Sequence, residues 1–445
     1  MTLLNALESV DATRTAIVTP AHSHCFGELV GRGRELARRF RGARVAAYST
    51  DIALATQIFT AADGVASCVL LLPQDVSQNL ARELCKRARI QAVVTDAPEK
   101  LACIADIVVN SPLDLPVREA AASCTPTQWI LSTSGTTSTP KLVSHSLAGL
   151  TRTTRTGRSR SVVPIWGMLY DYTRFAGLQV LMQSLLSGAT LAKPDHDAAL
   201  DAQLKFLASA GCTHLSATPS LWRNILMSGA ADQLGLRQVT LGGEIADQRI
   251  LDSLAHTYPS ARITHIFAST EAGVGFSVND GKPGFPAEYL NTSTSGVALD
   301  VREGTLWVRN ELVAADYVGD GGAVSSDGWV DTGDLVEKIG SRYLFKGRRS
   351  GVINVGGNKV HPEEVERVLI AHPHVVMARV FAKSNPIVGA LVAASIVRGP
   401  DAPSEFRSEL RHYLKSRLAP HMLPAVLEFT DALALSSGGK VTRQN

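Results

Sequence analysis

Short apolar runs alternate with stretches of helical periodicity over the first 120 residues and again between residues 190 and 267. Apolar side chains recur at near-helical intervals over residues 26–40, and strand-like runs follow at 44–48 and 67–72. The later strand-like runs lie at 190–192, 214–217, 238–241 and 263–267. Because strands that alternate with helices form buried parallel sheets, this pattern predicts an α/β fold.

The pattern changes in the last third of the chain. Residues 295–346 form short β-like runs separated by turns, which predicts a β-rich subdomain. Pro362 lies near a predicted helix start, with Glu363 and Glu364 in the first turn, where carboxylates favour the helix. A second helix is expected at about residues 404–418. Another small unit of mixed structure therefore follows residue 347.

Composition excludes several classes of protein. With 445 residues, of which 45% are hydrophobic, the chain can bury a large core. A net charge of +3 requires neither nucleic acid nor an anionic membrane as a partner, and the longest apolar runs are too short to span a bilayer. The N-terminus lacks the basic start and apolar block of a secretion signal, and six scattered cysteines form no zinc-binding pair. We therefore expect a cytoplasmic protein without a membrane span.

Residues 131–141 read LSTSGTTSTPK and have the composition of a phosphate-binding loop. Short hydroxyl side chains can donate to phosphate oxygens, Gly135 allows close backbone approach, and Lys141 supplies positive charge. Gly135 and Lys141 have Walker-loop spacing, but Pro140 replaces the second glycine and Leu142 replaces the magnesium-binding Ser or Thr. A P-loop NTPase is therefore disfavoured, and an ordinary Ser/Thr-rich surface loop is the alternative reading of this segment alone.

Four later segments accompany this loop in a fixed order. They are LGGE at 241–244, FASTE at 267–271, DGWVDTGD at 327–334 with FKGRR at 345–349 and GGNKVHPEEVE at 356–366, and LALSSGGKVTR at 433–443. Together the five segments resemble the motifs of the adenylate-forming superfamily, which includes acyl-CoA synthetases, aryl-acid ligases, luciferases and stand-alone adenylation domains. The resemblance covers most of the chain.

The resemblance implies a domain division and a two-step reaction. A large N-terminal domain of several subdomains, residues 1–348, would bind ATP and the acid, and a small mobile α+β domain, residues 349–445, would follow it. ATP and Mg²⁺ would convert a carboxylic acid to an acyl-adenylate, which coenzyme A would then attack to form a thioester. Two alternatives remain open: loading of a carrier-protein phosphopantetheine, and a non-catalytic subunit that binds nucleotide or adenylate.

The resemblance also assigns roles to individual residues. Lys440 would drive adenylation, Thr270 would contact phosphate, Glu271 would ligate the magnesium, and Asp334 would accept hydrogen bonds from the ribose. The expected ATP- or AMP-binding residues are Thr133, Ser134, Gly135, Thr136, Thr137, Lys141, Gly242, Gly243, Glu244, Phe267, Ala268, Ser269, Asp334 and Arg348. Ser350 would be the hinge, and Gly356 and Gly357 would leave room for the thiol.

The acid is expected to be aryl or medium acyl. Its predicted pocket residues are Tyr170, Asp171, Arg174, Gly177, Ala217 and Gly273. An amino acid is the second possibility, because residues 170–173, YDYT, resemble the F-D-x-S of amino-acid-activating domains, in which the aspartate pairs with an ammonium. Two departures from the family pattern bear on function: Ser138 replaces a phosphate-loop glycine, and Ser350–Gly351 replaces the usual charged hinge.

Overall fold

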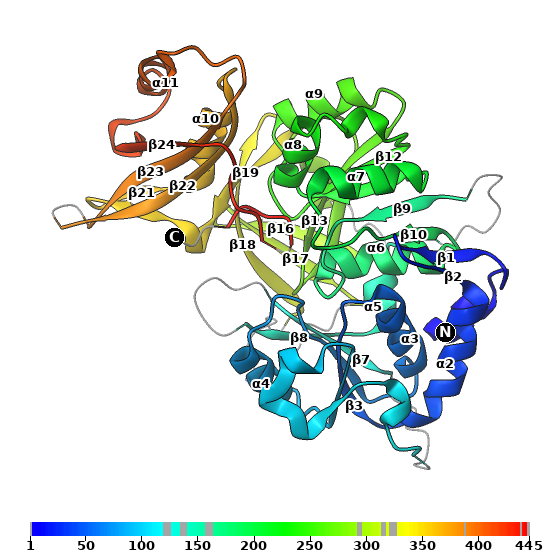
Figure 1. Ribbon diagram of the computed structural model, residues 1–445. Helices are drawn as coiled ribbons and strands as arrows, with labels where there is room; N and C mark the ends of the chain where they lie inside the picture. Colours follow the sequence, from blue (N-terminus) through cyan, green and yellow to red (C-terminus); the bar gives the residue numbers. More distant parts are fainter. Residues whose placement is uncertain are drawn as a thin grey trace.

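A computed structural model describes residues 2–118, 126–133, 140–155, 163–291, 296–312, 317–319, 327–386, 389–436 and 438–442. Within these residues the chain forms two mainly parallel sheets, an antiparallel sheet and a C-terminal sheet (Figure 1). The α/β fold with parallel sheets and a β-rich part is thereby confirmed.

The first parallel sheet, here called the six-stranded sheet, has the order β6-β5-β3-β4-β7-β8. Its strands are β3 (Arg44–Tyr48), β4 (Cys68–Leu71), β5 (Ala92–Thr95), β6 (Val108–Val109), β7 (Gln128–Ser132) and β8 (Leu142–His145). All pairs are parallel except β7 with β8. The central strands are buried at every position but one, as expected for a parallel sheet covered on both faces.

The second, the eight-stranded sheet, has the order β14-β13-β12-β11-β9-β10-β1-β2. Its strands are β1 (Thr15–Val18), β2 (Ser23–Cys25), β9 (Ile165–Met168), β10 (Thr190–Ala192), β11 (His214–Ala217), β12 (Gln238–Gly242), β13 (Arg262–Ser269) and β14 (Gly273–Val278). The inner strands are parallel, and β2 and β14 run antiparallel at the two edges. The strand runs predicted at 190–192, 214–217, 238–241 and 263–267 all fall on strands of this sheet.

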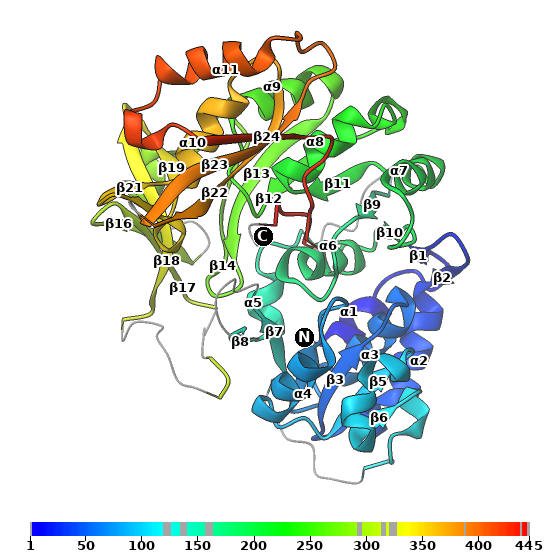
Figure 2. The same ribbon diagram turned by 60° about the vertical axis from the view of Figure 1, so that its left-hand side comes forward.

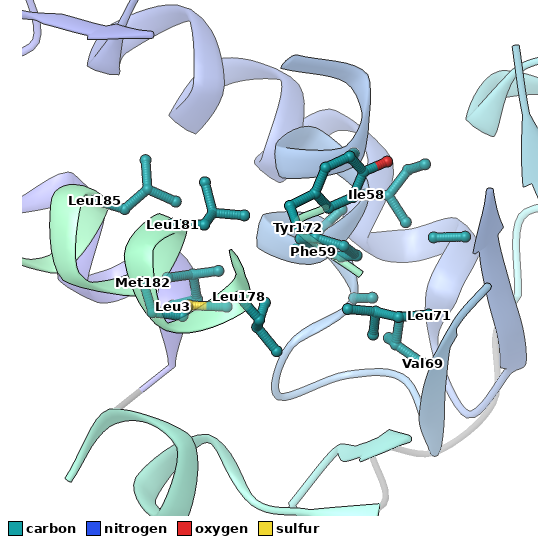
Figure 3. Close-up of a cluster of buried hydrophobic side chains, with 14 of the residues drawn as sticks. Leu3, Ile58, Phe59, Val69, Leu71, Tyr172, Leu178, Leu181, Met182 and Leu185 are labelled. Carbon is teal, nitrogen blue, oxygen red and sulfur yellow. The ribbon is translucent and has the colours of Figure 1, made fainter. Parts of the chain in front are cut away.

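Helices separate and cover the two parallel sheets. Their bounds are α1 (Leu3–Glu8), α2 (Phe26–Phe40), α3 (Ile52–Ala62), α4 (Gln78–Arg87), α5 (Leu147–Thr151), α6 (Phe175–Leu186), α7 (Leu200–Ser209), α8 (Pro219–Met227) and α9 (Gln248–Thr257). The buried faces of α1, α2, α3 and α6 pack between the sheets, as Figure 3 shows for side chains from α1, α3, β4 and α6. α4 covers the outer face of the six-stranded sheet, and α7, α8 and α9 cover the outer face of the eight-stranded sheet.

The rest of the chain forms two smaller sheets. The β-rich sheet is antiparallel, with strands β15 (Phe285–Pro286), β16 (Val297–Arg302), β17 (Thr305–Asn310), β18 (Trp329–Ile339) and β19 (Arg342–Arg348). The C-terminal sheet contains β20 (Ile353–Val355), β21 (Asn358–Val360), β22 (Val375–Asn385), β23 (Gly389–Arg398) and β24 (Val426–Thr430), packed with α10 (Pro362–Ile370) and α11 (Phe406–Lys415). Pro362 is the first residue of α10, and α11 lies within the range predicted for the second helix.

Short 3₁₀ turns connect several of these elements. They lie at Pro98–Ile107, Pro112–Asp114, Ala231–Gln233, Ala287–Asn291, Arg349–Gly351 and Pro420–Met422. Figure 2 shows the C-terminal sheet with α10 and α11 on one side of the eight-stranded sheet and the six-stranded sheet on the other. None of the helices in the described ranges has the length and apolar character needed to cross a membrane.

A buried carboxylate, that of Asp63, joins two helices of the central layer to a strand of the six-stranded sheet. Asp63 follows α3; its Oδ2 accepts a hydrogen bond from the backbone N–H of Leu3 at 2.8 Å, and its Oδ1 accepts one from Nε1 of Trp129 at 3.0 Å. Trp129 is fully buried on β7. Burial raises the pKa of Asp63, and the two hydrogen bonds act in the opposite direction. The side chain therefore anchors the N-terminal helix to the six-stranded sheet.

We expect Asp63→Ala to lower the free energy of unfolding. The two orphaned donors cost about 1–3 kcal/mol each, and relief of the buried carboxylate returns part of this loss. Urea denaturation with tryptophan fluorescence measures the change. Asp11→Ala is the matched control, since Asp11 is exposed and accepts only local hydrogen bonds from Thr13, and we expect a smaller loss there. Equal losses in the two variants would contradict the anchoring role.

Candidate active site

A cavity of about 2300 Å³, here called the central cleft, opens between the eight-stranded sheet, the β-rich sheet and residues 438–442, here called the C-terminal segment. It includes the residues at the carboxyl ends of β11, β12 and β13, the edge at which open α/β sheets bind ligands. The predicted site residues that line it are Thr133, Tyr170, Arg174, Gly177, Gly242, Gly243, Glu244, Phe267, Ala268, Ser269, Thr270, Glu271, Asp334, Arg348, Ser350 and Lys440. All five sequence segments therefore contribute residues to one cavity, and Thr133 is the predicted site residue that comes from segment 131–141.

Lys440 enters the central cleft on the segment that follows β24, which leaves the C-terminal sheet and runs back towards the eight-stranded sheet (Figures 1 and 2). The hydroxyl of Thr218 donates a hydrogen bond to the carbonyl of Gly439. On the other side of Lys440, the backbone N–H of Val441 donates to Oε1 of Glu244 at 3.0 Å. Contacts on both sides of Lys440 thus fix the backbone that carries its ammonium group.

Glu244 connects this segment to the start of a helix. Its Oε2 accepts a hydrogen bond from the backbone N–H of Ser220 at 2.9 Å, in the first turn of α8. The first N–H groups of a helix have no partner within the helix, and its N-terminus favours a negative charge. One carboxylate therefore bridges the end of β12, the start of α8 and the backbone beside Lys440.

The charges around Lys440 oppose one another. Desolvation by the surrounding protein lowers the pKa of Lys440, and the Arg348 guanidinium lowers it further. Glu244, Asp334 and Glu271 act in the opposite direction. Although the residue stays accessible through the open cleft, its protonated form is destabilised there. An anion that entered the cleft would stabilise the ammonium.

Asp334 and Arg348 form a pair on neighbouring strands of the β-rich sheet. They are directly opposite each other on β18 and β19, and Nε of Arg348 lies 3.1 Å from Oδ1 of Asp334. Burial raises the pKa of Asp334, and the charge of Arg348 opposes this effect. The Asp334 carboxylate faces the central cleft with acceptor capacity left for ligand hydroxyl groups.

Thr270 and Glu271 lie in the turn between β13 and β14 and line the cleft. Just before them, the ring of Phe267 stacks on Phe276 and Phe345, with centroid distances of 5.3 and 5.4 Å. No group of three His, Cys, Asp or Glu side chains in the described ranges is placed to hold a metal ion alone. One cleft carboxylate is still compatible with Mg²⁺, which often takes one or two protein carboxylates and completes its shell with phosphate and water.

The structure describes the predicted phosphate-binding loop only at its two ends. Ser134, Gly135, Thr136 and Thr137, and also Ser138, lie outside the described residues. The N–H of Thr133 donates to the carbonyl of Lys141 at 2.9 Å, and the N–H of Lys141 donates to Oγ1 of Thr133 at 3.1 Å. These bonds extend the β7–β8 pair and bring the two ends of the loop together.

Tyr317 is a residue that sequence reasoning missed. The Lys141 ammonium lies 4.5 Å from the centre of the Tyr317 ring, and Lys141 does not line the central cleft. Burial raises the pKa of Tyr317, the charge of Glu271 raises it further, and the charge of Lys141 lowers it. Tyr317 therefore contacts Lys141, at the end of the predicted phosphate loop, and lies close enough to Glu271 to be influenced by its charge. Tyr317 belongs to none of the five sequence segments, so the sequence did not indicate that it would lie near Lys141.

The predicted acid-pocket residues divide into two groups. Tyr170, Arg174 and Gly177 line the central cleft, whereas Asp171, Ala217 and Gly273 are not among its lining residues. Asp171 is buried; its Oδ1 accepts hydrogen bonds from the N–H and the hydroxyl of Thr173 at 2.9 and 2.7 Å. Its other oxygen accepts a long hydrogen bond, 3.4 Å, from the N–H of Gln74. Asp171 thus stabilises its own turn.

A row of hydroxyl groups lines the cleft beside this region. Ser216, Thr240 and Thr264 are in register on β11, β12 and β13, and all three are cleft residues. The alternate positions on these strands, such as Leu215 and Val239, pack against the helices of the outer face. One face of a mainly parallel sheet is therefore polar where it meets the cavity.

The expected hinge and thiol residues lie near the start of the C-terminal sheet. Ser350, in the turn Arg349–Gly351, lines the edge of the central cleft. Gly356 and Gly357 form the turn between β20 and β21 and do not line the cleft. The structure thus places the predicted hinge residue, Ser350, at the cleft and the two glycines outside its lining.

Comparison with known families accounts for most of the chain. Residues 20–318 match the family model described as "AMP-binding enzyme", and residues 364–440 match "AMP-binding enzyme C-terminal domain". The two regions cover every strand of the parallel sheets except β1, and the C-terminal sheet from β22 to β24.

Individual relatives are distant. The chain is 28% identical to "4-coumarate--CoA ligase-like 6" of Oryza sativa subsp. japonica over 52% of its own length and 42% of that protein. It is 28% identical to "Isonitrile lipopeptide synthase" of Streptomyces coeruleorubidus over 96% of its own length and 32% of that protein. The chain therefore spans less than half the length of these two relatives.

Solved structures resemble the whole chain. An anthranilate CoA ligase in complex with anthranoyl-AMP superposes with a TM-score of 0.83 at 19% identity, covering 99% of this chain and 95% of that one. A benzoate CoA ligase from Burkholderia xenovorans gives a TM-score of 0.83 at 20% identity, covering 99% and 97%. At such identities the likeness establishes the fold, large N-terminal part and smaller C-terminal part included.

We expect Gly243→Ala to impair the position of Lys440. Gly243 has φ = +82°, and a β-carbon there would lie 2.9 Å from Cε of Lys440. An alanine in this left-handed backbone conformation costs about 1–2 kcal/mol. Its β-carbon would also displace the ammonium group of Lys440. We therefore predict that any rate that depends on Lys440 falls at least about tenfold. Gly242→Ala is the comparison, because its β-carbon would have only an ordinary contact at 3.8 Å. A loss in Gly242→Ala as large as in Gly243→Ala would contradict this explanation.

Proposed function

Since this chain belongs to the AMP-binding enzyme family, we propose that it activates a carboxylic acid with ATP and passes the acyl group to the thiol of coenzyme A. The observation that carries the proposal is the position of Lys440, which two backbone contacts direct into the cleft that holds Glu271 and Asp334. A subunit that only bound nucleotide would not need a lysine held in this way.

In the first step an oxygen of the acid attacks the α-phosphate of ATP. The new oxygen–phosphorus bond replaces the bond to pyrophosphate, which leaves, and the product is an acyl-adenylate. Two anions must approach, so the positive charge of Lys440 would offset their repulsion. Mg²⁺, held through Glu271, would supply further charge on the phosphates.

The other cleft residues would bind the nucleotide. Asp334 would accept hydrogen bonds from the ribose hydroxyls, and Arg348, which it pairs with, would hold its carboxylate in place and add a contact of its own. The backbone at Gly242 and Gly243 would shape the adenine slot, together with residues 267–269. Thr270 would contact phosphate beside the loop that runs from Thr133 to Lys141.

We propose an aryl or medium acyl acid as the substrate. Trp166, Tyr170 and Phe175 supply aromatic walls to the cleft, and the hydroxyl row of Ser216 and its neighbours supplies hydrogen-bonding groups. An amino acid has less support, because the Asp171 carboxylate that would bind its ammonium is engaged in its own turn, away from the cleft lining. The cleft would thus accept a flat or short acid with a polar substituent.

In the second step the thiol sulfur attacks the acyl carbon, and AMP leaves with the oxygen that came from the acid. We propose that residues 349–445 form a separate domain that rotates about Ser350 between the steps, so that Lys440 withdraws and Gly356 and Gly357 approach the thiol. Coenzyme A is the proposed acceptor, and a carrier-protein phosphopantetheine is the alternative. The reaction would take place in the cytoplasm.

Exchange of labelled pyrophosphate into ATP tests the first step. We expect exchange with one class of acid in a panel of benzoates, hydroxybenzoates, medium-chain fatty acids and amino acids, and a loss of at least ~10²-fold in Lys440→Ala. Lys415→Ala, an exposed lysine in the last turn of α11, controls for the loss of a charge. Tight ATP binding without exchange for any acid would favour the non-catalytic alternative.

The exchange rate should also depend on pH through Lys440. Desolvation lowers the pKa of Lys440. The side chain therefore loses its positive charge at a lower pH than an ordinary lysine, whose pKa is about 10.4. We expect the rate to fall as pH rises through this lowered pKa. Lys440→Arg, which stays charged, should move the alkaline limb to higher pH whatever its maximal rate. An unchanged limb in Lys440→Arg would assign the titration to another group.

A further inference from the structure

Arg249, on helix α9 of the large N-terminal part, binds the C-terminal end of helix α10. Nη1 of Arg249 donates to the carbonyls of Ile370, His372 and Val375 at 2.9, 2.8 and 2.7 Å, and Nη2 donates to the carbonyl of Pro373 at 2.8 Å. These carbonyls belong to the last residue of α10, the turn after it and the first residue of β22. A single side chain from α9 therefore makes four hydrogen bonds to the C-terminal part of the chain.

The position of Arg249 in its own helix argues against a local role. Arg249 is the second residue of α9, where the helix dipole presents positive charge and a cation is unfavourable. Asp247 already caps this end, because its Oδ1 accepts from the N–H of Ile250 at 3.1 Å and its Oδ2 pairs with Arg223 of α8. The end of α10, by contrast, presents carbonyl groups and negative charge. The guanidinium is thus placed to stabilise the other helix.

The contact is connected to Lys440 through β22. Val375, one of the bound carbonyls, begins this strand, and Arg379 further along it donates from Nη1 to the carbonyl of Thr442 at 3.0 Å. Thr442 is two residues after Lys440. The same segment also binds Glu244 through the Val441 N–H, and Glu244 precedes Arg249 by five residues. Segment 244–249 therefore binds the C-terminal part at two places: Arg249 binds the end of α10 and the start of β22, and Glu244 binds the residue after Lys440.

We infer that Arg249 is a positioning residue for the adenylation step. It holds residues 349–445 in the orientation that places Lys440 in the central cleft, and its hydrogen bonds must break before those residues can rotate for thioester formation. The inference rests on the proposed function for its chemistry. Its structural part, that Arg249 keeps the Lys440 segment in place, can be tested without any reaction.

The test separates the two half-reactions. In Arg249→Ala we expect pyrophosphate exchange to fall by at least about tenfold, because four hydrogen bonds to a charged group are lost. Thioester formation from a supplied synthetic acyl-adenylate and coenzyme A should stay unchanged or become faster. Arg249→Lys, whose ammonium keeps the charge without the planar fork, should be intermediate. Arg411→Ala, at an exposed position on α11, is the matched control.

Hydrogen–deuterium exchange supplies a readout independent of activity. The Val441 amide is bonded to Glu244, so deuterium uptake of the C-terminal peptide should rise in Arg249→Ala and stay at the wild-type level in Arg411→Ala. Unchanged uptake, or an equal fall in both half-reactions, would overturn the inference. Absence of exchange in the wild-type protein with every acid would refute the proposed function, and the deuterium uptake alone would then decide the role of Arg249.

Discussion

The site depends on one carboxylate that is shared between two backbone amides. Glu244 accepts from the first turn of α8 and from the residue after Lys440, so a helix start in the large part of the molecule and the C-terminal segment meet at the same side chain. The N-terminus of a helix stabilises a carboxylate through its free N–H groups and the helix dipole, and no cation is needed. Because one oxygen is held there, the other is fixed in direction and can orient the segment that carries the lysine.

This arrangement explains why the cleft can be both charged and open. Its carboxylates and cations alternate in space: Asp334 with Arg348, and Glu244 and Glu271 around Lys440. The charge of Arg348 opposes the rise that burial causes in the pKa of Asp334, and the nearby carboxylates oppose the fall that desolvation causes in the pKa of Lys440. The protein holds these side chains through backbone contacts at Gly439 and Val441 and leaves the middle of the cavity to a ligand.

Local patterns in the sequence were sufficient for the strands of the eight-stranded sheet from β10 to β13, the helix at Pro362 and many of the residues that line the cleft, since short motifs place glycines and carboxylates at strand ends. They were insufficient where a side chain's direction depends on distant elements. Asp171 looks like a pocket residue in the sequence, yet Thr173 two residues later satisfies it. Arg249 looks like one more charge on an amphipathic helix, because its four acceptors lie more than 120 residues away. Tertiary contacts of this kind leave no periodic signal.

The hydroxyl row on β11, β12 and β13 also has a thermodynamic consequence. Hydroxyl groups at a cavity wall, as in this row, favour ordered water, whereas an apolar strand face would leave the space poorly hydrated. A molecule that displaces such water must reproduce its hydrogen bonds or lose affinity. The side-chain amide of Gln238 already donates to the hydroxyl groups of Thr240 and Thr264, so these two keep one partner whatever enters. Selection at this wall would therefore act through dehydration: an acid of suitable shape but without polar atoms there would remove water from the hydroxyl groups without replacing it.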